Sequence, residues 1–183
     1  IDHMMSCLSD FENFLYNSSL PVLIKTGIAH VQFETIHPFL DGNGRLGRLL
    51  ITLLLCESQM LEEPILYLSL YLKQNRSMYY DLLQQVRLQG TWETWLEFFL
   101  EGIVKSAKQA INTAIEINNL FENDYKKIES LGRARFSCLQ TLNYLKKLPQ
   151  TSVPLLSQEL GMTLPTVRSS LNHMVDLGVL EEI

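Results

Sequence analysis

A run of twelve residues, 37–48, concentrates groups that can bind phosphate. It reads His-Pro-Phe-Leu-Asp-Gly-Asn-Gly-Arg-Leu-Gly-Arg. Gly42 and Gly44 let the backbone approach a ligand closely, and with Asn43 they stand at the expected start of a helix. The first amides of a helix lack intrahelical partners, and its positive dipole end favours anions. The run therefore predicts an anion site, best suited to phosphates.

Ionisable side chains accompany these glycines. Arg45 and Arg48 are three residues apart and share one helix face, and guanidinium groups bind phosphate oxygens well. Asp41 can hold a divalent ion against those phosphates. His37 stands at the loop entrance, and histidine is the side chain that most often serves as a general base near neutral pH. Together these side chains supply two phosphate-binding arginines, a carboxylate for a metal ion and a general base.

Three other interpretations of this run need weighing. Residues 42–47 match the dinucleotide fingerprint G-x-G-x-x-G, but no strand precedes them and no parallel-sheet pattern exists. A Walker A loop would need Gly-Lys-Ser/Thr, which is absent. A capped turn between two helices explains Pro38 and the glycines. It does not explain why His37, Asp41 and the two arginines gather around an amide nest.

Helices are expected to position this run. Apolar residues repeat at helical spacing in segments that we predict to be helices: 4–15, 21–36, 46–54, 78–86 and 92–121. The second should end at Ile36, because Pro38 disfavours helical geometry at His37. Thr91 is a suitable N-cap for the long helix that starts at Trp92, whose later part has coiled-coil-like spacing.

The C-terminal part has a different pattern. Helices are predicted around 139–145, over 153–160 and over 163–177, followed by a strand over 179–183. Two short helices joined at Gly161 and followed by a strand suggest a winged helix-turn-helix. We expect an all-α fold with this short β element, divided into domains 1–125 and 126–183.

Composition narrows the class of protein. The net charge of -5 argues against nonspecific coating of nucleic acid. No apolar run reaches the roughly 20 residues of a membrane helix, and no signal peptide is visible. Cys7, Cys56 and Cys138 lie far apart, so we expect buried, reduced thiols in a cytoplasmic protein and no metal site among them. The start at Ile1, without an initiator methionine, suggests a fragment.

Residues 37–48 closely resemble the signature of the Fic family, H-P-F-x-[D/E]-G-N-G-R-x-x-R, at every fixed position. The segments 30–36, 71–80 and 90–102 resemble the family's neighbouring helices. A winged-helix tail is common in one bacterial branch, so the resemblance covers essentially the whole chain. It implies a Fic helical bundle followed by a winged-helix domain.

The resemblance also implies roles for single residues. His37 would deprotonate a target hydroxyl that attacks the α-phosphate of ATP, and Asp41 would hold Mg²⁺ between the α- and β-phosphates. Phe39 would be a buried anchor of the loop. For Tyr79 and Tyr80, beside the adenine in the family, ordinary core packing is the alternative. The nucleotide-binding set is Gly42, Asn43, Gly44, Arg45, Leu46, Gly47, Arg48, Tyr79 and Tyr80.

The implied function is a protein adenylyltransferase, which moves AMP from ATP to a Ser, Thr or Tyr hydroxyl of a target protein or of itself. Gly44 supports nucleotidyl transfer, because the family's kinases carry lysine there. A homodimer is expected. The family's flap and its inhibitory pattern [S/T]-x-x-x-E-[G/N] are absent from these residues and are expected upstream.

Two other functions remain as alternatives. The first is a DNA-binding winged-helix regulator with a nucleotide-sensing Fic domain, although the candidate recognition helix carries only Arg168, helped by Ser169 and Asn172. The second is a degenerate Fic scaffold, against which the intact motif argues.

Overall fold

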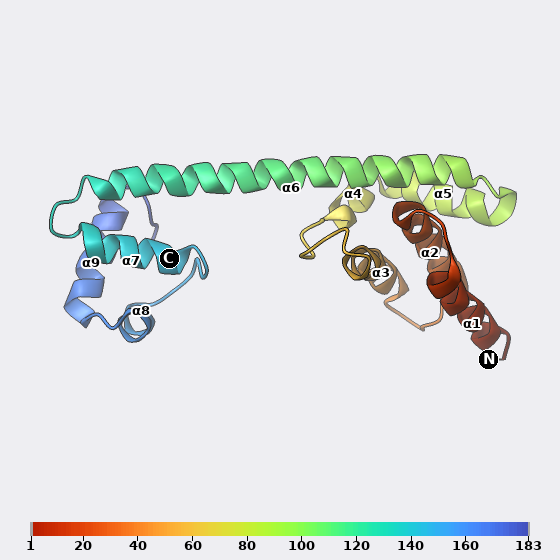
Figure 1. Ribbon diagram of the computed structural model, residues 1–183, viewed down its shortest axis with the longest axis horizontal. Helices are drawn as coiled ribbons and strands as arrows, with labels where there is room; N and C mark the ends of the chain where they lie inside the picture. The colour runs from red at the N-terminus through yellow and green to blue at the C-terminus, as the bar shows by residue number, and fades with distance from the viewer. Residues whose placement is uncertain (1, 183) are drawn as a thin grey trace. The chain divides into compact units, whose positions relative to one another are not determined.

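The computed structural model describes residues 2–182, and within them it contains nine α-helices and no strand (Figure 1). In chain order they are α1 (Asp2–Asn17), α2 (Val22–Ile36), α3 (Asn43–Glu57), α4 (Leu68–Gln74), α5 (Arg76–Gln89), α6 (Trp92–Glu129), α7 (Arg135–Leu145), α8 (Val153–Leu160) and α9 (Leu164–Asp176). The predicted all-α class is confirmed. No helix among the described residues is long and apolar enough to cross a membrane.

The chain forms two compact units, Ile1–Asn112 and Thr113–Ile183. Their border falls inside α6, so that helix contributes its first part to one core and its last part to the other. The expected domain border, between residues 125 and 126, lies further along the same helix and stays a prediction.

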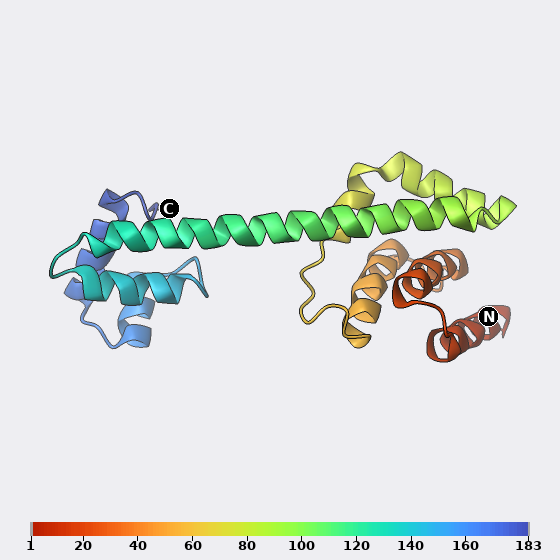
Figure 2. The ribbon, with the colours of Figure 1, turned by 45° about the horizontal axis from the view of Figure 1, so that its top comes forward.

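The core of the first unit is built around aromatic residues of α6. Trp95 and Phe99 are fully buried. The Trp95 indole donates a hydrogen bond of 2.9 Å to the carbonyl of Gly27 on α2, so the polar edge of this large ring is satisfied inside the core. Buried residues of α3, α4 and α5 complete the same cluster. In Figure 2, α2 and α3 run side by side, and the 37–48 run spans their connection and the start of α3.

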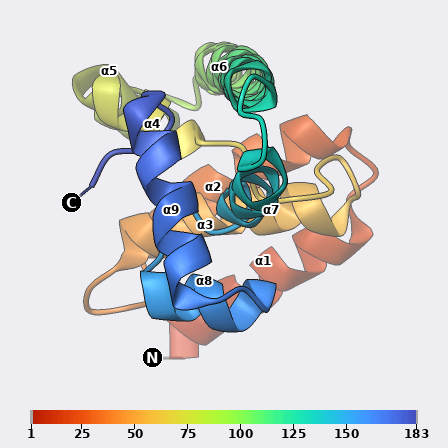
Figure 3. The ribbon, with the colours of Figure 1, turned by 90° about the vertical axis from the view of Figure 1, so that its left-hand side faces the viewer.

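In the second unit, α7, α8 and α9 pack against one another, as Figure 3 shows. Their core joins the last part of α6 through Ile128, which is fully buried, with Cys138, Leu142 and Met174. Thr163 caps α9 by accepting a hydrogen bond from the Thr166 amide. The three C-terminal helices therefore follow the sequence pattern closely.

The predicted strand after Gly178 is wrong over residues 179–182, and Ile183 lies outside the described residues. The amides of Val179 and Leu180 donate to the carbonyl of Met174 at 2.9 and 3.2 Å. Backbone groups that close the end of a helix in this way are not free to pair with a strand. The winged-helix assignment thus lacks its β element here.

Two smaller expectations also need correction. Thr91 does not cap α6, because its hydroxyl is buried without a hydrogen-bond partner. Cys138 is buried as expected, but Cys7 and Cys56 are only half-buried; all three are free thiols. The sequence could not predict these details, because the packing around a Thr or Cys side chain decides whether it is buried and which partner it contacts.

Candidate functional site

The 37–48 run comprises the connection between α2 and α3, residues 37–42, and the first six residues of α3. His37 ends α2 in the left-handed conformation, with φ 51° and ψ 57°, and its amide donates to the carbonyl of Phe33. A residue before proline is driven out of the helical region, so Pro38 stops the helix as the sequence predicted. The imidazole is exposed at this turn. It is therefore accessible to a substrate, as a general base must be.

Asn43 holds the loop together. Its side-chain oxygen accepts from the Phe39 amide at 2.9 Å, and its side-chain nitrogen donates to the Phe39 carbonyl at 2.6 Å. Asn43 is almost fully buried, whereas the Phe39 side chain is half exposed. The expected anchoring role of the Phe39 ring is thus wrong: the asparagine amide matches both backbone groups of residue 39, which an aromatic ring cannot do.

Helix α3 begins with an open amino end. Gly42, its N-cap, has φ 84°, a conformation that glycine adopts without steric cost, and no side chain caps the helix. The amides of Arg45 and Leu46 both donate to the Gly42 carbonyl. The preceding amides, of Asn43 and Gly44, are the orphan donors of this first turn. Free amides at a helix start are the donors that an anion nest uses, and the nest itself stays a prediction.

Two oppositely charged side chains border this turn in solvent. The Asp41 carboxylate accepts from the Gly42 amide at 2.6 Å through one oxygen and lies 3.5 Å from the Arg45 guanidinium through the other. Both side chains are more than three-quarters exposed, so the ion pair adds little stability. The same exposure leaves Arg45 able to turn to a phosphate and Asp41 to a cation.

A buried carboxyl group lies on the inner side of the turn. Glu34 of α2 is only 7% exposed, and one of its oxygens, Oε1, has no hydrogen-bond partner. A Cβ at Gly44 would lie 3.7 Å from that oxygen and 3.3 Å from Nη1 of Arg48. Burial raises the pKa of Glu34, while the nearby charges of His37, Arg48 and Arg87 oppose the rise. The buried Glu34 carboxyl group therefore lies next to the first two turns of α3.

Gly47 allows this close approach. A Cβ at position 47 would lie only 2.5 Å from Oε1 of Glu34, which is closer than real atoms come. Gly47 also accepts, through its carbonyl, a hydrogen bond of 2.9 Å from Nδ1 of His30. His30 is fully buried. Its Nε2 lies 2.8 Å from the Tyr79 hydroxyl.

A cavity of about 420 Å³ opens beside His37. Tyr80 lines it, half exposed, with the Arg76 guanidinium 5.6 Å from its ring centre. The full lining is Glu34, Thr35, His37, Tyr80, Leu83, Gln84 and Arg87. The structure therefore brings Tyr80 and His37 to one cavity, while Tyr79 is buried and does not line it.

Arg87 joins α5 to the carboxyl end of α2 at this cavity. It donates to the Thr35 hydroxyl at 3.1 Å and to the Glu34 carbonyl at 2.8 Å. A cation at the last carbonyls of a helix is favourable, and here it secures the turn before His37. Sequence reasoning missed both Arg87 and Glu34. The available signal for Glu34 was an acid one turn before the motif histidine in a mostly apolar helix.

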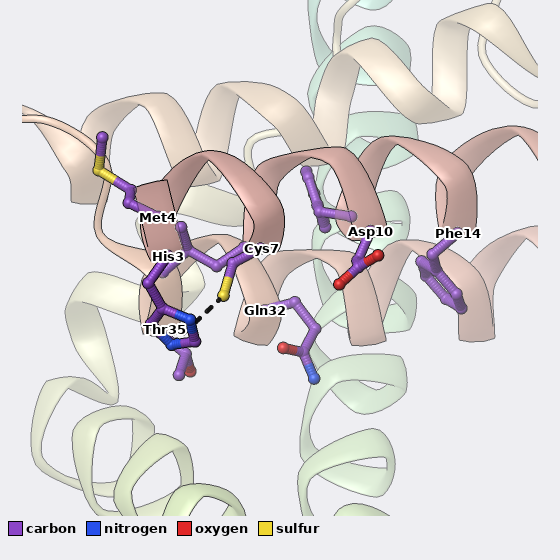
Figure 4. Close-up of a pocket in the computed structure, with 9 residues that line it drawn as sticks. His3, Met4, Cys7, Asp10, Phe14, Gln32 and Thr35 are labelled. Carbon is purple, nitrogen blue, oxygen red and sulfur yellow. Dashed lines mark hydrogen bonds between the residues drawn. The ribbon is translucent and has the colours of Figure 1, made fainter. Parts of the chain in front are cut away.

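A second cavity, of about 590 Å³, lies between α1 and α2 (Figure 4). His3 and Cys7 face each other there, with Nε2 and Sγ 3.9 Å apart. No group of three potential metal-binding side chains occurs within residues 2–182. The lining is His3, Met4, Cys7, Asp10, Phe11, Phe14, Gln32, Thr35 and Ile36, most of it apolar or neutral.

Three comparisons place the chain among known proteins. Residues 1–55 match the model of the Fic/DOC family. Over 81 residues, the chain is 38% identical to the protein adenylyltransferase Fic of Drosophila willistoni, covering 44% of this chain and 15% of that protein. Over 50 residues, it is 48% identical to a probable protein adenylyltransferase of Aquifex aeolicus, covering 27% and 16% of the two chains. The chain thus spans about a sixth of the length of these relatives.

Among solved structures, a Fic family protein from Desulfovibrio desulfuricans matches with a TM-score of 0.59 and 26% identity. The match covers 96% of this chain and 49% of that protein. Both the motif-bearing segment and the arrangement of helices therefore agree with the family. Residues 1–55 thus match the Fic/DOC family model within a Fic-like all-α fold, and parts of the chain are distantly similar to protein adenylyltransferases.

Proposed function

We propose that this chain carries the catalytic part of a protein adenylyltransferase, which transfers AMP from ATP to a Ser, Thr or Tyr hydroxyl. The observation that carries the proposal is the cavity that His37 and Tyr80 line together. Glu34 also lines this cavity, and its Oε1 would lie 3.7 Å from a Cβ at Gly44 in the first turn of α3. A base, a stacking surface and a phosphate nest are the three parts that such a transfer needs. The names of the similar proteins support the same activity.

In this mechanism the protein orients ATP and removes one proton. The amino end of α3 and Arg48 bind the phosphates, and Tyr80 contacts the adenine ring. His37 accepts the proton of the target hydroxyl as its oxygen bonds to the α-phosphorus. The bond from that phosphorus to the bridging oxygen of the β-phosphate breaks, and pyrophosphate leaves. An in-line displacement of this kind depends on positioning and on charge stabilisation.

The side chains fit a magnesium ion shared with the substrate. Asp41 offers one exposed carboxylate beside the nest, and Mg²⁺ in phosphate-transfer sites keeps several waters and takes one or two carboxylates besides the phosphates. When bound, the ion would neutralise charge on the phosphates. Asp41 then has to exchange its loose contact with Arg45 for the cation.

The test is modification of protein by this chain in the presence of ATP and Mg²⁺. Mass spectrometry should detect an AMP adduct on Ser, Thr or Tyr, either on the chain itself or on proteins of a cell extract. His37→Ala should remove the adduct and leave ATP affinity within about twofold, because the base acts in the chemical step and not in holding phosphates. An equal loss of ATP affinity in this variant contradicts the assignment of His37 as the base.

A DNA-binding regulator is the second candidate, with the C-terminal helices as its working part. α8 and α9 are joined through Gly161, as in a helix-turn-helix, and α9 carries Arg168. A homodimer is proposed for either function.

A further inference from the structure

Arg87 of α5 makes two hydrogen bonds to the last turn of α2, directly before His37. Its Nη2 donates to the Glu34 carbonyl at 2.8 Å, and its Nε donates to the Thr35 hydroxyl at 3.1 Å. The Thr35 hydroxyl in turn donates to the Val31 carbonyl at 2.7 Å, so its oxygen is left to accept from the arginine. A side chain 52 and 53 residues further along the chain thus holds two successive residues of α2.

The backbone that follows these two residues needs such support. His37 has φ 51°, in the left-handed region that residues other than glycine enter at a cost in energy, and such a conformation persists only where the surrounding structure fixes it. The His37 amide donates to the Phe33 carbonyl. The next carbonyl, of Glu34, would pair with the amide of residue 38 in a continuing helix, but Pro38 has no amide hydrogen. Arg87 supplies the missing donor.

Arg87 also reaches the cavity in which the proposed chemistry takes place. Arg87 and His37 line the same cavity of about 420 Å³. A general base has to lie within hydrogen-bond reach of the proton that it accepts, and a misplacement of about 1 Å can cost roughly 100-fold in rate. The imidazole is carried by the backbone of residue 37, so whatever fixes this backbone also fixes where the base stands.

We propose that Arg87 is a positioning residue for His37. By holding the Glu34 carbonyl and the Thr35 hydroxyl, it fixes the turn from which the imidazole reaches the target hydroxyl. The inference rests on the proposed function, in which His37 is the general base. It assigns Arg87 a part in the chemical step and none in holding ATP.

The test compares the rate of AMP transfer at saturating ATP with ATP affinity measured by calorimetry. The acceptor is the one that mass spectrometry identifies, either the chain itself or a protein of the extract. Arg87→Ala should lower the rate by about 10- to 100-fold, because the base is displaced, and change ATP affinity by less than about twofold. Arg87→Lys keeps the positive charge but loses the planar fork that makes both hydrogen bonds, so it should recover little of the rate.

Thr35→Val tests one of the two contacts by itself. It keeps the branched side chain and removes the hydroxyl that accepts from Arg87. The transfer rate should fall by about 3- to 10-fold, the effect of one hydrogen bond. Added to Arg87→Ala, the same substitution should cause little further loss, because its partner is already gone. Thr35→Val also serves in place of Arg87→Ala if that variant fails to fold by thermal unfolding.

Lys25→Gln is the matched control. Lys25 also joins two helices of the first unit through a cation and a carbonyl, because its Nζ donates to the Leu15 carbonyl of α1 at 3.2 Å. It stands in the first turns of α2, at the opposite end from His37. Its loss should lower the midpoint of thermal unfolding and leave the transfer rate unchanged.

The outcomes separate the two proposals. An unchanged rate in Arg87→Ala, full recovery by Arg87→Lys, or a loss of ATP affinity as large as the loss of rate overturns the positioning role and leaves the proposed function standing. Equal slowing by Lys25→Gln overturns it as well, because the effect is then one of general stability. Absence of an AMP adduct with the unaltered protein overturns the proposed function and the inference together.

Discussion

At the scale of single residues, the 37–48 run contains exposed side chains that can contact a ligand and buried residues that fix the backbone. His37, Asp41 and Arg45 are exposed, and each can reach a ligand. Asn43 and Gly47 are buried, and they hold the loop closed and let α2 approach α3. Reactive groups have to be solvated until a substrate arrives, whereas groups that fix backbone geometry work best where water cannot compete for their hydrogen bonds.

The role of Asp41 can be tested apart from the chemistry. Asp41→Ala should abolish the tightening of ATP binding by Mg²⁺, because it removes the candidate carboxylate ligand. Calorimetric titrations with and without Mg²⁺ measure this difference. Glu12→Ala, an exposed acid of α1, is the control and should keep the full effect. If Mg²⁺ still tightens ATP binding in Asp41→Ala by its normal factor, the ligand is another group.

At the scale of elements, the contact between α2 and α3 positions the site. The connection between them is six residues long, 37–42, and both of its ends are constrained: Pro38 stops α2, and Gly42 starts α3 in a left-handed conformation. Arg87 secures the last turn of α2 from α5. The packing of α2 against α3 therefore sets where His37 lies relative to the amino end of α3.

Gly47→Ala should disrupt this pair. The added methyl group would meet Oε1 of Glu34 at 2.5 Å, and such overpacking costs about 1–3 kcal/mol. We expect a lower midpoint of thermal unfolding and weaker ATP binding. Gly132→Ala is the control, because a Cβ at that position meets nothing within 4 Å. Unchanged thermal stability in Gly47→Ala would show that α2 and α3 are not packed as described.

At the scale of the whole molecule, charge argues against a role in binding DNA. The net charge of the chain is -5, and the segment from Leu131 onward contains five Arg or Lys residues and four Asp or Glu residues. Arg168 is the one lysine or arginine of α9. Proteins that bind DNA neutralise several phosphates with basic side chains, and each contact steepens the dependence of affinity on salt. The C-terminal unit offers few such contacts.

We therefore expect duplex DNA to bind weakly and with a shallow salt dependence. An anisotropy titration at moderate salt should give a Kd above about 1 µM for both random and promoter DNA, without preference. Submicromolar binding to one sequence, with roughly tenfold preference over random DNA, would instead establish the regulator as the function.

The sequence by itself determined the helical class, the stop of α2 before Pro38 and the open amino end of α3. Each depends on local rules: helical periodicity, the steric effect of proline and the freedom of glycine. Tertiary structure alone decided that Glu34 is buried against Gly47, that Tyr79 points to His30 while Tyr80 lines the cavity, and that Val179 and Leu180 close a helix instead of forming a strand. These contacts join residues far apart in the chain or depend on which partner a backbone amide finds, and no local pattern encodes that choice.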